Sequence, residues 1–453
     1  MGDAAAAASE APRPRRFVGR RRKDAATAAP GEAPASSRTE LARRARAGAG
    51  KSRSLALSQV PDEIANDPEL KHAMSQLPAN YNFQVAKTVW RLKRAGARRV
   101  ALQLPEGLLL FACVLADIFE QCAGVEEALV MADVTYGACC IDDYSARALG
   151  CDFMVHYGHS CLVPIDITAK ENAFGEKLQV MYVFVDIDID VEHLVECVKL
   201  TFPDRGNTRL ALMGTIQFAA AMHRAKTLLD AHYPRGSHVP QAKPLSRGEV
   251  LGCTSPSLAG EAVDAFVFVA DGRFHLESAM IANPEIPAYR YNPYDRVLTH
   301  EAYDTPLMRK VRRGEIEKAQ GAKRWAIVLG TLGRQGNPAI LRRIEALLKK
   351  HGREHFVLLM SEVFPAKLAL LESSVDAWVQ IACPRLSIDW GEAFSKPLLT
   401  PYECFVAFGE AEWREVYPQD FYSKGSGPWT NFHEEKYDDD KSEQVATKQE
   451  PAM

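Results

Sequence analysis

The sequence predicts an α/β fold in which three similar small domains each carry a parallel sheet, with a disordered tail at either end. One pattern occurs three times: an apolar strand ends in a polar or glycine-rich turn and leads into a helix. These strands are expected at residues 100–104, 210–213 and 325–329. Uninterrupted apolar strands that alternate with helices are typical of parallel sheets covered on both faces. The repetition therefore predicts triplication of one doubly wound unit.

A later strand in each repeat is introduced by an acidic residue, which supports the triplication. Asp152, Asp264 and Asp376 each stand directly before an apolar segment, at intervals of roughly a hundred residues. The two ends of the chain have few large hydrophobic residues and cannot bury enough apolar surface to order themselves. The expected division of the chain is a basic disordered tail, a first α/β domain with an N-terminal helical segment, a second and a third α/β domain, and an acidic disordered tail: 1–55, 56–205, 206–320, 321–424 and 425–453.

The composition restricts the class of protein. The chain has 453 residues, of which 47% are hydrophobic and 25% charged, and its net charge is −3. This near-neutral balance predicts no general affinity for nucleic acid or for acidic membranes. No apolar run approaches the ~20 residues of a membrane span, and the start lacks the apolar stretch of a secretory signal. We expect a cytoplasmic protein, with Arg20–Lys23 as a candidate nuclear localisation patch.

Three of the ten cysteines have sequence surroundings suited to chemistry. Cys139, Cys253 and Cys383 fall one in each repeat, near the expected carboxyl ends of strands, where open α/β sheets bind ligands. Small residues precede each thiol and allow a bulky ligand to approach the backbone. Three converging thiolates favour a 4Fe–4S cluster with one open iron, or zinc. The absence of a C-x-x-C pair weakens the zinc interpretation.

Other interpretations of the cysteines stay open. Buried structural thiols are an alternative for all three positions. Cys140 and Cys161 are rivals of Cys139, which is favoured because it directly follows a Gly-Ala step. The cysteines at 113, 122 and 197 have apolar neighbours at helical spacing and are expected in the core, and His156, His159 and His275 are expected to be structural.

A glycine-rich turn follows the third predicted strand. Residues 330–336 place glycines at three-residue intervals before a helix, whose N-terminus suits a carboxylate or phosphate. The pattern is neither a dinucleotide-binding fingerprint nor a P-loop. Gly330, Arg334 and Gln335 are therefore candidate substrate-binding residues, with a simple tight turn as the alternative.

Five segments together resemble a known family. They are DVTYGACCIDDYSARALGCDFMVHYGHSC, LGCTSP, DGRFHLESAMIANP, GTLGRQGN and ACPRLSIDWG. The chain is similar over residues 55–430 to the 2-(3-amino-3-carboxypropyl)histidine synthase family, in its subunit 1 branch, the diphthamide biosynthesis protein 1 family.

The resemblance implies a pseudo-threefold arrangement of the three domains and a 4Fe–4S cluster held by Cys139, Cys253 and Cys383. It also implies a non-standard radical reaction that transfers the 3-amino-3-carboxypropyl group of S-adenosylmethionine to a histidine of translation elongation factor 2. The implied partners are the paralogous subunit 2 in a heterodimer and a small electron-donor protein. The usual radical motif C-x-x-x-C-x-x-C is absent from the sequence.

Two functions of other classes remain alternatives. One is a three-domain iron–sulfur enzyme similar to quinolinate synthase, which acts as a Lewis acid without reductant. The other is a non-catalytic scaffold subunit whose cysteines are structural.

Overall fold

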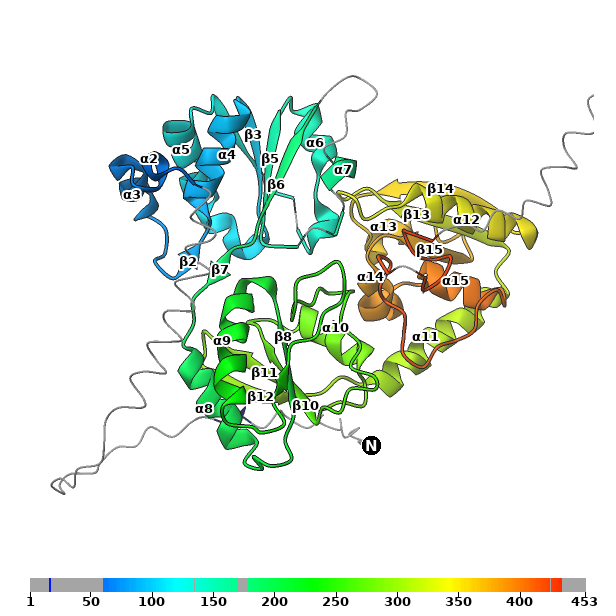
Figure 1. The fold of residues 1–453 in the computed structure, drawn as a ribbon. Helices are drawn as coiled ribbons and strands as arrows, with labels where there is room; N and C mark the ends of the chain where they lie inside the picture. Colours follow the sequence, from blue (N-terminus) through cyan, green and yellow to red (C-terminus); the bar gives the residue numbers. More distant parts are fainter. Residues whose placement is uncertain are drawn as a thin grey trace, which may run out of the picture.

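The computed structural model describes residues 60–133, 135–160, 162–163, 165–168, 177–423 and 425–433, together with the backbone of Arg16–Phe17. Most of the predicted basic tail, most of the predicted acidic tail and Cys161 lie outside these residues. Three parallel sheets with flanking helices form three similar units in a pseudo-threefold arrangement (Figure 1). The predicted α/β fold is confirmed.

The first unit has a four-stranded parallel sheet in the order β4-β3-β5-β6. Its strands are β3 (Arg99–Gln103), β4 (Glu127–Met131), β5 (Phe153–Tyr157) and β6 (Gln179–Val183). Helices α2 (Asp62–Ala65) and α3 (Pro68–Met74) precede it, and its other helices are α4 (Val85–Ala95), η1 (Glu106–Phe111), α5 (Ala112–Ala123), η2 (Ala138–Cys140), α6 (Asp143–Ala148) and α7 (Ile165–Thr168). The short strands β2 (Tyr81–Asn82) and β7 (Asp186–Ile187) form a separate antiparallel pair.

The second unit repeats this order as β9-β8-β10-β11 and adds antiparallel strands beyond β11. Its strands are β8 (Leu210–Gly214), β9 (Ser237–His238), β10 (Ala265–Val269), β11 (Ala288–Asn292) and β12 (Val297–Glu301), with β1 (Arg16–Phe17) beside β12. Its helices are α8 (Val191–Thr201), η3 (Ile216–Phe218), α9 (Ala219–Asp230) and α10 (Phe274–Ala282).

The third unit has the order β14-β13-β15-β16. Its strands are β13 (Arg324–Gly330), β14 (Glu354–Met360), β15 (Ala377–Ile381) and β16 (Leu398–Leu399). Its helices are α11 (Thr305–Gln320), α12 (Pro338–Lys350), α13 (Pro365–Ala369), α14 (Pro384–Trp390), η4 (Gly391–Ala393) and α15 (Pro401–Ala407). Every unit therefore places its second strand at an edge, beside its first.

The three acids that introduce β5, β10 and β15 have one structural role. Each carboxylate accepts a hydrogen bond from a backbone N–H group at the start of the first strand of its unit, which is β3, β8 or β13. Asp152 accepts from Arg98 at 2.9 Å, Asp264 from Arg209 at 2.7 Å, and Asp376 from Arg324 at 2.9 Å. Since a carboxylate satisfies donors that the sheet leaves unpaired, the repeated acid fixes the register of two adjacent strands.

Hydrophobic burial is extensive in all three units. The largest buried cluster runs through the first and second units, from Leu70 to Leu298, whereas a separate cluster lies mainly in the third unit. The packed part of the chain extends past the expected tail boundary at Gly425. Trp429 belongs to the buried cluster of the third unit and is 2% exposed. This packing was not predictable, because an isolated tryptophan in a polar segment shows no hydrophobic periodicity.

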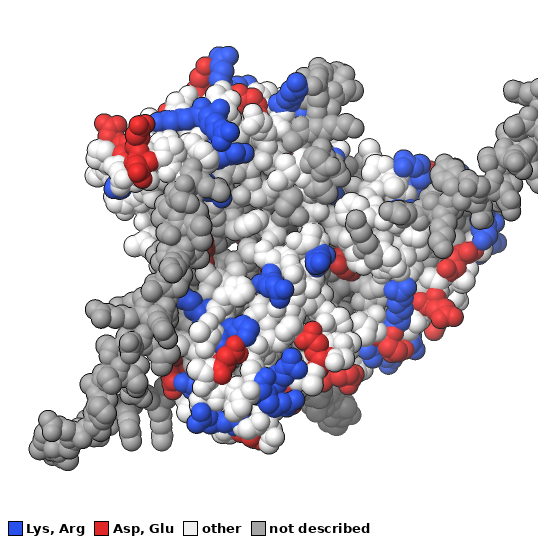
Figure 2. Space-filling model, viewed as in Figure 1, with Lys and Arg blue, Asp and Glu red and all other residues white. Residues whose placement is uncertain are grey.

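The surface is mixed in charge. On the face seen in Figure 2, acidic and basic side chains are interspersed, in keeping with a net charge of −3. Among the described residues, no helix combines the length and apolar character needed to cross a membrane.

Candidate metal centre

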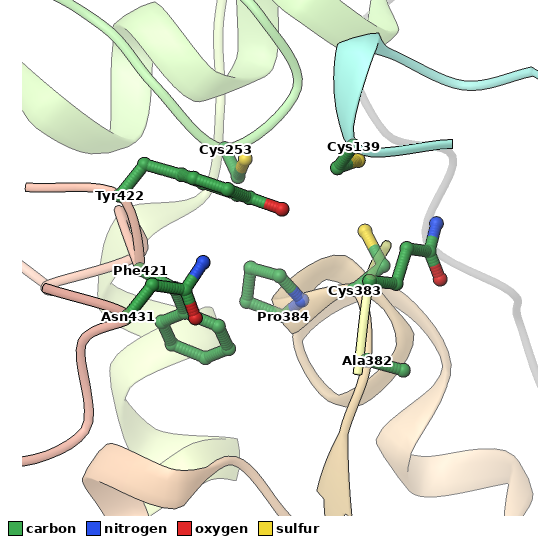
Figure 3. A pocket seen from close by; sticks show the side chains of 9 residues that line it. Cys139, Cys253, Ala382, Cys383, Pro384, Phe421, Tyr422 and Asn431 are labelled. Carbon is green, nitrogen blue, oxygen red and sulfur yellow. The ribbon is translucent and has the colours of Figure 1, made fainter. Parts of the chain in front are cut away.

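Cys139, Cys253 and Cys383 line one small cavity where the three units meet (Figure 3). Its volume is about 20 Å³, and it is bounded among the described residues by those cysteines and by Gln335, Ala382, Pro384, Phe421, Tyr422 and Asn431. Each unit thus contributes one thiol. The cavity is the place where the cysteines singled out in the sequence come together.

The three thiols reach the cavity from different positions within their units. Cys139 lies in the short helix η2, after β4, and Cys253 lies in the loop between β9 and β10. Cys383 directly follows β15 and is the residue before α14. Cys139 and Cys253 therefore precede the acid-led strands β5 and β10, whereas Cys383 follows β15. The pseudo-threefold symmetry of the sheets does not extend to the cysteine positions.

Two glycines of the 330–336 turn permit close packing around the cavity. A Cβ atom on Gly330 would lie 2.6 Å from Cβ of Ala382, beside Cys383. Gly333 has a φ of +54°, and a Cβ atom there would lie 2.5 Å from the carbonyl carbon of Cys140. Gly333 therefore needs glycine so that the third unit can approach the first, whereas Gly330 needs glycine so that β13 can pack against the Cys383 loop of its own unit.

The adjacent thiols of Cys139 and Cys140 occupy different surroundings. Cys139 borders the cavity, and its Sγ lies 4.0 Å from that of Cys140. The buried Cys140 Sγ accepts hydrogen bonds from the Tyr136 N–H at 3.4 Å and from Gln335 Nε2 at 3.3 Å. Cys139 thus has the geometry expected of a ligand, and Cys140 that of a hydrogen-bonded support.

The pKa values of the three cavity thiols are all raised, so without a metal these thiols stay protonated. The hydrogen bond with Cys140, together with burial, holds the pKa of Cys139 well above its ordinary value. Burial also raises the pKa of Cys253, and it raises the pKa of Cys383 to about 11. Three thiolates therefore require compensating positive charge, which a soft metal supplies.

Three soft thiolates, one from each unit, are a donor set typical of an iron–sulfur cluster. Within the described ranges, no group of three or more His, Cys, Asp or Glu side chains is arranged to bind one metal ion. A cluster holds its thiolates apart by binding each to a different metal atom. The donor set in this cavity therefore fits an iron–sulfur cluster.

The boundary between the first and third units beside the cysteines is held by Arg334. Its guanidinium donates to both carboxylate oxygens of Asp143, at 2.7 and 2.6 Å, and to the Tyr144 hydroxyl at 2.6 Å. Its backbone N–H donates to the Cys139 carbonyl at 2.8 Å. Of the predicted substrate-binding residues, Gln335 lines the cavity, whereas Arg334 is engaged in this pair and Gly330 packs on Ala382.

The boundary between the second and third units is held by Arg385, which sequence reasoning missed. It donates to the Gly252 and Phe274 carbonyls at 3.2 and 2.7 Å and to Glu277 at 2.6 Å. Its position two residues after Cys383, in a motif already noted, was the available signal. Arg385 consequently ties the Cys383 loop to the Cys253 loop.

A buried carboxylate holds the boundary between the first and second units. Glu249 accepts a hydrogen bond from the Ser160 hydroxyl, and its other oxygen accepts from the Ser160 N–H at 3.3 Å. All three boundaries are therefore closed by buried or partly buried polar contacts. These contacts fix the relative positions of the three thiols.

A second cavity of about 800 Å³ lies against the cysteine site. Tyr136, Leu251 and Arg385 line it, and each is within three residues of one of the three cysteines. His159 and His275 also line it, and the Nδ1 atom of each has no hydrogen-bond partner among the described residues. A cavity of this size and mixed polarity is large enough for a nucleoside-sized ligand.

The remaining cysteines and histidines only partly follow expectation. The expected core position of Cys113 is wrong: it is exposed, because α5 turns Leu115, Ala116 and Phe119 inward instead. Cys122 and Cys197 are partly buried. The buried ring of His156 makes a 2.9 Å hydrogen bond to Gln103, as a structural histidine does.

Comparison with known proteins gives the family. A family model described as "Putative diphthamide synthesis protein" matches residues 104–418. The chain is 56% identical over 387 residues to the Gallus gallus protein named 2-(3-amino-3-carboxypropyl)histidine synthase subunit 1, covering 85% of this chain and 91% of that protein. The chain belongs to the 2-(3-amino-3-carboxypropyl)histidine synthase subunit 1 family.

Other members of this synthase family and one solved structure are also similar. The Schizosaccharomyces pombe subunit 1 is 52% identical over 379 residues, covering 82% of this chain and 84% of that protein. Dph2 from Pyrococcus horikoshii shares the fold with a TM-score of 0.60 and 28% identity, over 74% of this chain and 92% of its own. A further structure of that Dph2, with the same score and identity over 75% and 93% of the two chains, contains a 4Fe–4S cluster.

Proposed function

We propose that this chain is the catalytic subunit that transfers the 3-amino-3-carboxypropyl group of S-adenosylmethionine to a histidine of translation elongation factor 2. This reaction is the first step of diphthamide biosynthesis. The observation that carries the proposal is the convergence of Cys139, Cys253 and Cys383 on one cavity. The names of the relatives support it, because they describe a synthase of the expected product.

The proposed cofactor is a 4Fe–4S cluster held by these three thiols. The donor set is three soft ligands whose thiolate forms require positive charge, and the similar Dph2 carries such a cluster. Three ligands leave one iron open to the amino and carboxylate groups of the methionine moiety. When bound, the cluster supplies the electron that breaks a C–S bond of S-adenosylmethionine.

The residues of the chain would bind the substrates and exclude water. The 800 Å³ cavity is the proposed entrance for S-adenosylmethionine and for the acceptor histidine. His159 and His275 line this cavity and are the proposed polar contacts of the substrate. Leu251 and Phe274 line the same cavity and keep water from a reactive intermediate.

Of the three predicted substrate-binding residues, Gly330, Arg334 and Gln335, one lies at the cysteine cavity. Gln335 is the proposed contact, because its side chain borders the cysteine cavity. Arg334 and Gly330 were predicted together with it, and their contact with substrate stays a prediction. The ion pair of Arg334 with Asp143 favours a structural role at the boundary between the first and third units, and the close approach of Gly330 to Ala382 favours a packing role within the third unit.

The decisive experiment identifies the bond that breaks. Anaerobic protein, dithionite, S-adenosylmethionine, the partner subunit and elongation factor 2 are combined, and the nucleosides are separated by chromatography. The proposal predicts 5′-methylthioadenosine and a modified histidine, both dependent on reductant. If 5′-deoxyadenosine is the main nucleoside, the proposed cleavage is wrong. Turnover without reductant would favour a Lewis-acid enzyme, and an inactive, colourless protein would favour a scaffold.

The proposed partners follow from the same reaction. They are a paralogous subunit 2 in a heterodimer, a small electron-donor protein and elongation factor 2, in the cytoplasm. The name "subunit 1" shared by the relatives supports a complex of more than one chain. Co-purification of the two subunits should give a one-to-one complex.

A further inference from the structure

One wall of the cysteine cavity is formed by the last described segment of the chain. Phe421, Tyr422 and Asn431 line the cavity together with the three cysteines. The family model ends at residue 418, so these three residues lie outside the matched region. We call residues 417–431, apart from Lys424, the C-terminal strap. The strap thus touches the proposed metal centre with residues that lie beyond the matched region.

The strap is tied to the second unit next to a proposed ligand. Gln419 Nε2 donates to the Ser278 carbonyl in α10 at 2.7 Å. The Asp420 carboxylate accepts from the Thr254 hydroxyl at 3.3 Å, and Thr254 directly follows Cys253. The same carboxylate accepts from the Tyr422 N–H at 2.8 Å. These contacts hold the backbone of Tyr422 against the Cys253 loop.

The strap is also tied to the third unit. The Trp429 ring packs on Tyr402, with ring centroids 4.9 Å apart, and Phe421 is 4% exposed. The Asn431 N–H donates to the Phe421 carbonyl at 2.7 Å, which closes the strap into a loop. Because both arms are anchored, the Tyr422 ring has a defined position over the cavity.

We propose that the strap closes the cysteine cavity against solvent, with the Tyr422 ring as its cover. Figure 3 shows the ring reaching from the strap past Cys253, with its hydroxyl directed between Cys139 and Cys383. A cluster exposed to water loses iron and changes its reduction potential, so an aromatic cover protects it. With this side closed, substrates enter from the 800 Å³ cavity on the side lined by Tyr136, Leu251 and Arg385.

The test compares Tyr422→Ala with Tyr422→Phe, which keeps the ring and removes the hydroxyl. The proposal rests on the proposed cluster, so the first readout is iron transfer to a chelator under argon, followed by loss of visible absorbance. We expect Tyr422→Ala to lose iron about tenfold faster than the parent, the low end of effects seen for residues around metal ligands. Tyr422→Phe should match the parent. Equal rates in all three proteins would overturn the proposal, and so would a Tyr422→Phe protein as fast as Tyr422→Ala.

A second readout does not depend on the cluster. In the iron-free reduced protein, a maleimide should label Cys139, Cys253 and Cys383 faster in Tyr422→Ala than in Tyr422→Phe, as followed by peptide mass spectrometry. Cys113 is exposed in any case and serves as the internal control. A colourless parent would refute the cofactor assignment, whereas unchanged labelling would refute the strap.

A second variant, with its substitution outside the cavity, tests the proposal in case Tyr422→Ala does not fold. Gln419→Ala removes the contact with Ser278 without altering a cavity-lining side chain. Gln419→Ala should increase both the rate of iron loss to the chelator and the rate of maleimide labelling, as Tyr422→Ala does. Its thermal midpoint should stay close to that of the parent. Gln419→Ala rates equal to those of the parent would count against the strap as a cover.

Discussion

Arg334 of the third unit and Asp143 of the first form a two-point ion pair, with N–O distances of 2.7 and 2.6 Å. The Asp143 side chain is fully buried, whereas that of Arg334 is 20% exposed. The pair lies beside the hydrogen bond from Arg334 N–H to the Cys139 carbonyl. It thus connects the stability of a boundary between two units to the position of a proposed ligand.

The first prediction concerns this pair. Arg334→Met leaves the buried Asp143 carboxylate with Arg147, 3.7 Å away, as its remaining ion-pair partner in the described part of the chain. We expect the free energy of unfolding to fall by about 3 kcal/mol, as when one member of a buried pair is removed. The control is Arg324→Met, which breaks the more exposed pair with Asp376 and should cost less than about 1 kcal/mol. Equal losses in urea unfolding would contradict this account.

The second prediction concerns a buried pair far from the cysteines. Arg312 in α11 donates to both oxygens of Glu403 at 2.6 and 2.7 Å, and both side chains are 0% exposed. Arg312→Met should destabilise the protein by about 3–5 kcal/mol, since it leaves Glu403 buried without its cation. The adjacent Arg313 pairs on the surface with Glu415, so Arg313→Met should change stability by less than about 1 kcal/mol. A thermal melt of both variants distinguishes the two cases.

The third prediction concerns pH. Burial lowers the pKa of His156 to about 3 and that of His159 to about 4. The unfolded chain protonates these rings near pH 6.5, whereas the folded chain does not, so each histidine opposes folding in acid. Their contribution to stability is complete above about pH 6.5 and falls toward pH 4 by up to about 1.4 kcal/mol per pH unit for each ring.

The measurement is urea unfolding of the iron-free protein between about pH 7 and about pH 5. His156→Gln should reduce the loss of stability over this range, because it removes one titrating ring. Buried Glu249 has a pKa raised by burial and acts in the opposite direction, so the difference between parent and variant is the relevant quantity. If the free energy of unfolding changes equally with pH in the parent and in His156→Gln, His156 is not a buried neutral ring that opposes folding in acid.

The fourth prediction concerns the partner subunit. The edge strand β14 spans seven residues and exposes Val357 and Leu359, at 37% and 64%. The corresponding edge strand of the second unit, β9, has only two residues. A long apolar edge favours pairing with another chain, and the proposed subunit 2 is the expected occupant.

A double substitution, Val357→Lys and Leu359→Lys, should therefore reduce co-purification of subunit 2. The control is Leu200→Lys at the end of α8, where an exposed leucine lies on a different unit. Unchanged co-purification of the double variant would assign the interface elsewhere.

The sequence predicted the features that depend on local pattern. The first strands β3, β8 and β13 coincide with the apolar segments that predicted them. The strands β5, β10 and β15 each begin directly after the acidic residue that was expected to introduce them. Of the three cysteines, Cys383 lies at a strand end as expected, whereas Cys139 and Cys253 lie in connecting segments, and their convergence was implied by the family resemblance. The strands are predictable because hydrophobic periodicity and strand direction determine them without knowledge of distant contacts.

The features that escaped prediction depend on contacts between distant segments. The role of Arg385 requires the Gly252 and Phe274 carbonyls, more than a hundred positions earlier. Tyr422 reaches the cysteine cavity only because Trp429 and Gln419 anchor the strap on other elements. Cys113 has apolar neighbours in sequence, yet the orientation of α5 turns it outward. No local pattern reports such relationships.

The most direct test of the central claim is the iron and sulfide content of anaerobically purified protein, with its visible spectrum. The account predicts a brown parent with a 4Fe–4S stoichiometry, which is lost in Cys139→Ala, Cys253→Ala and Cys383→Ala and retained in Cys113→Ala. Cys140→Ala should retain most of its iron, because the Cys140 thiol is hydrogen-bonded to Tyr136 and Gln335. A colourless parent, a single zinc per chain, or iron lost from Cys140→Ala but not from Cys139→Ala would contradict the account.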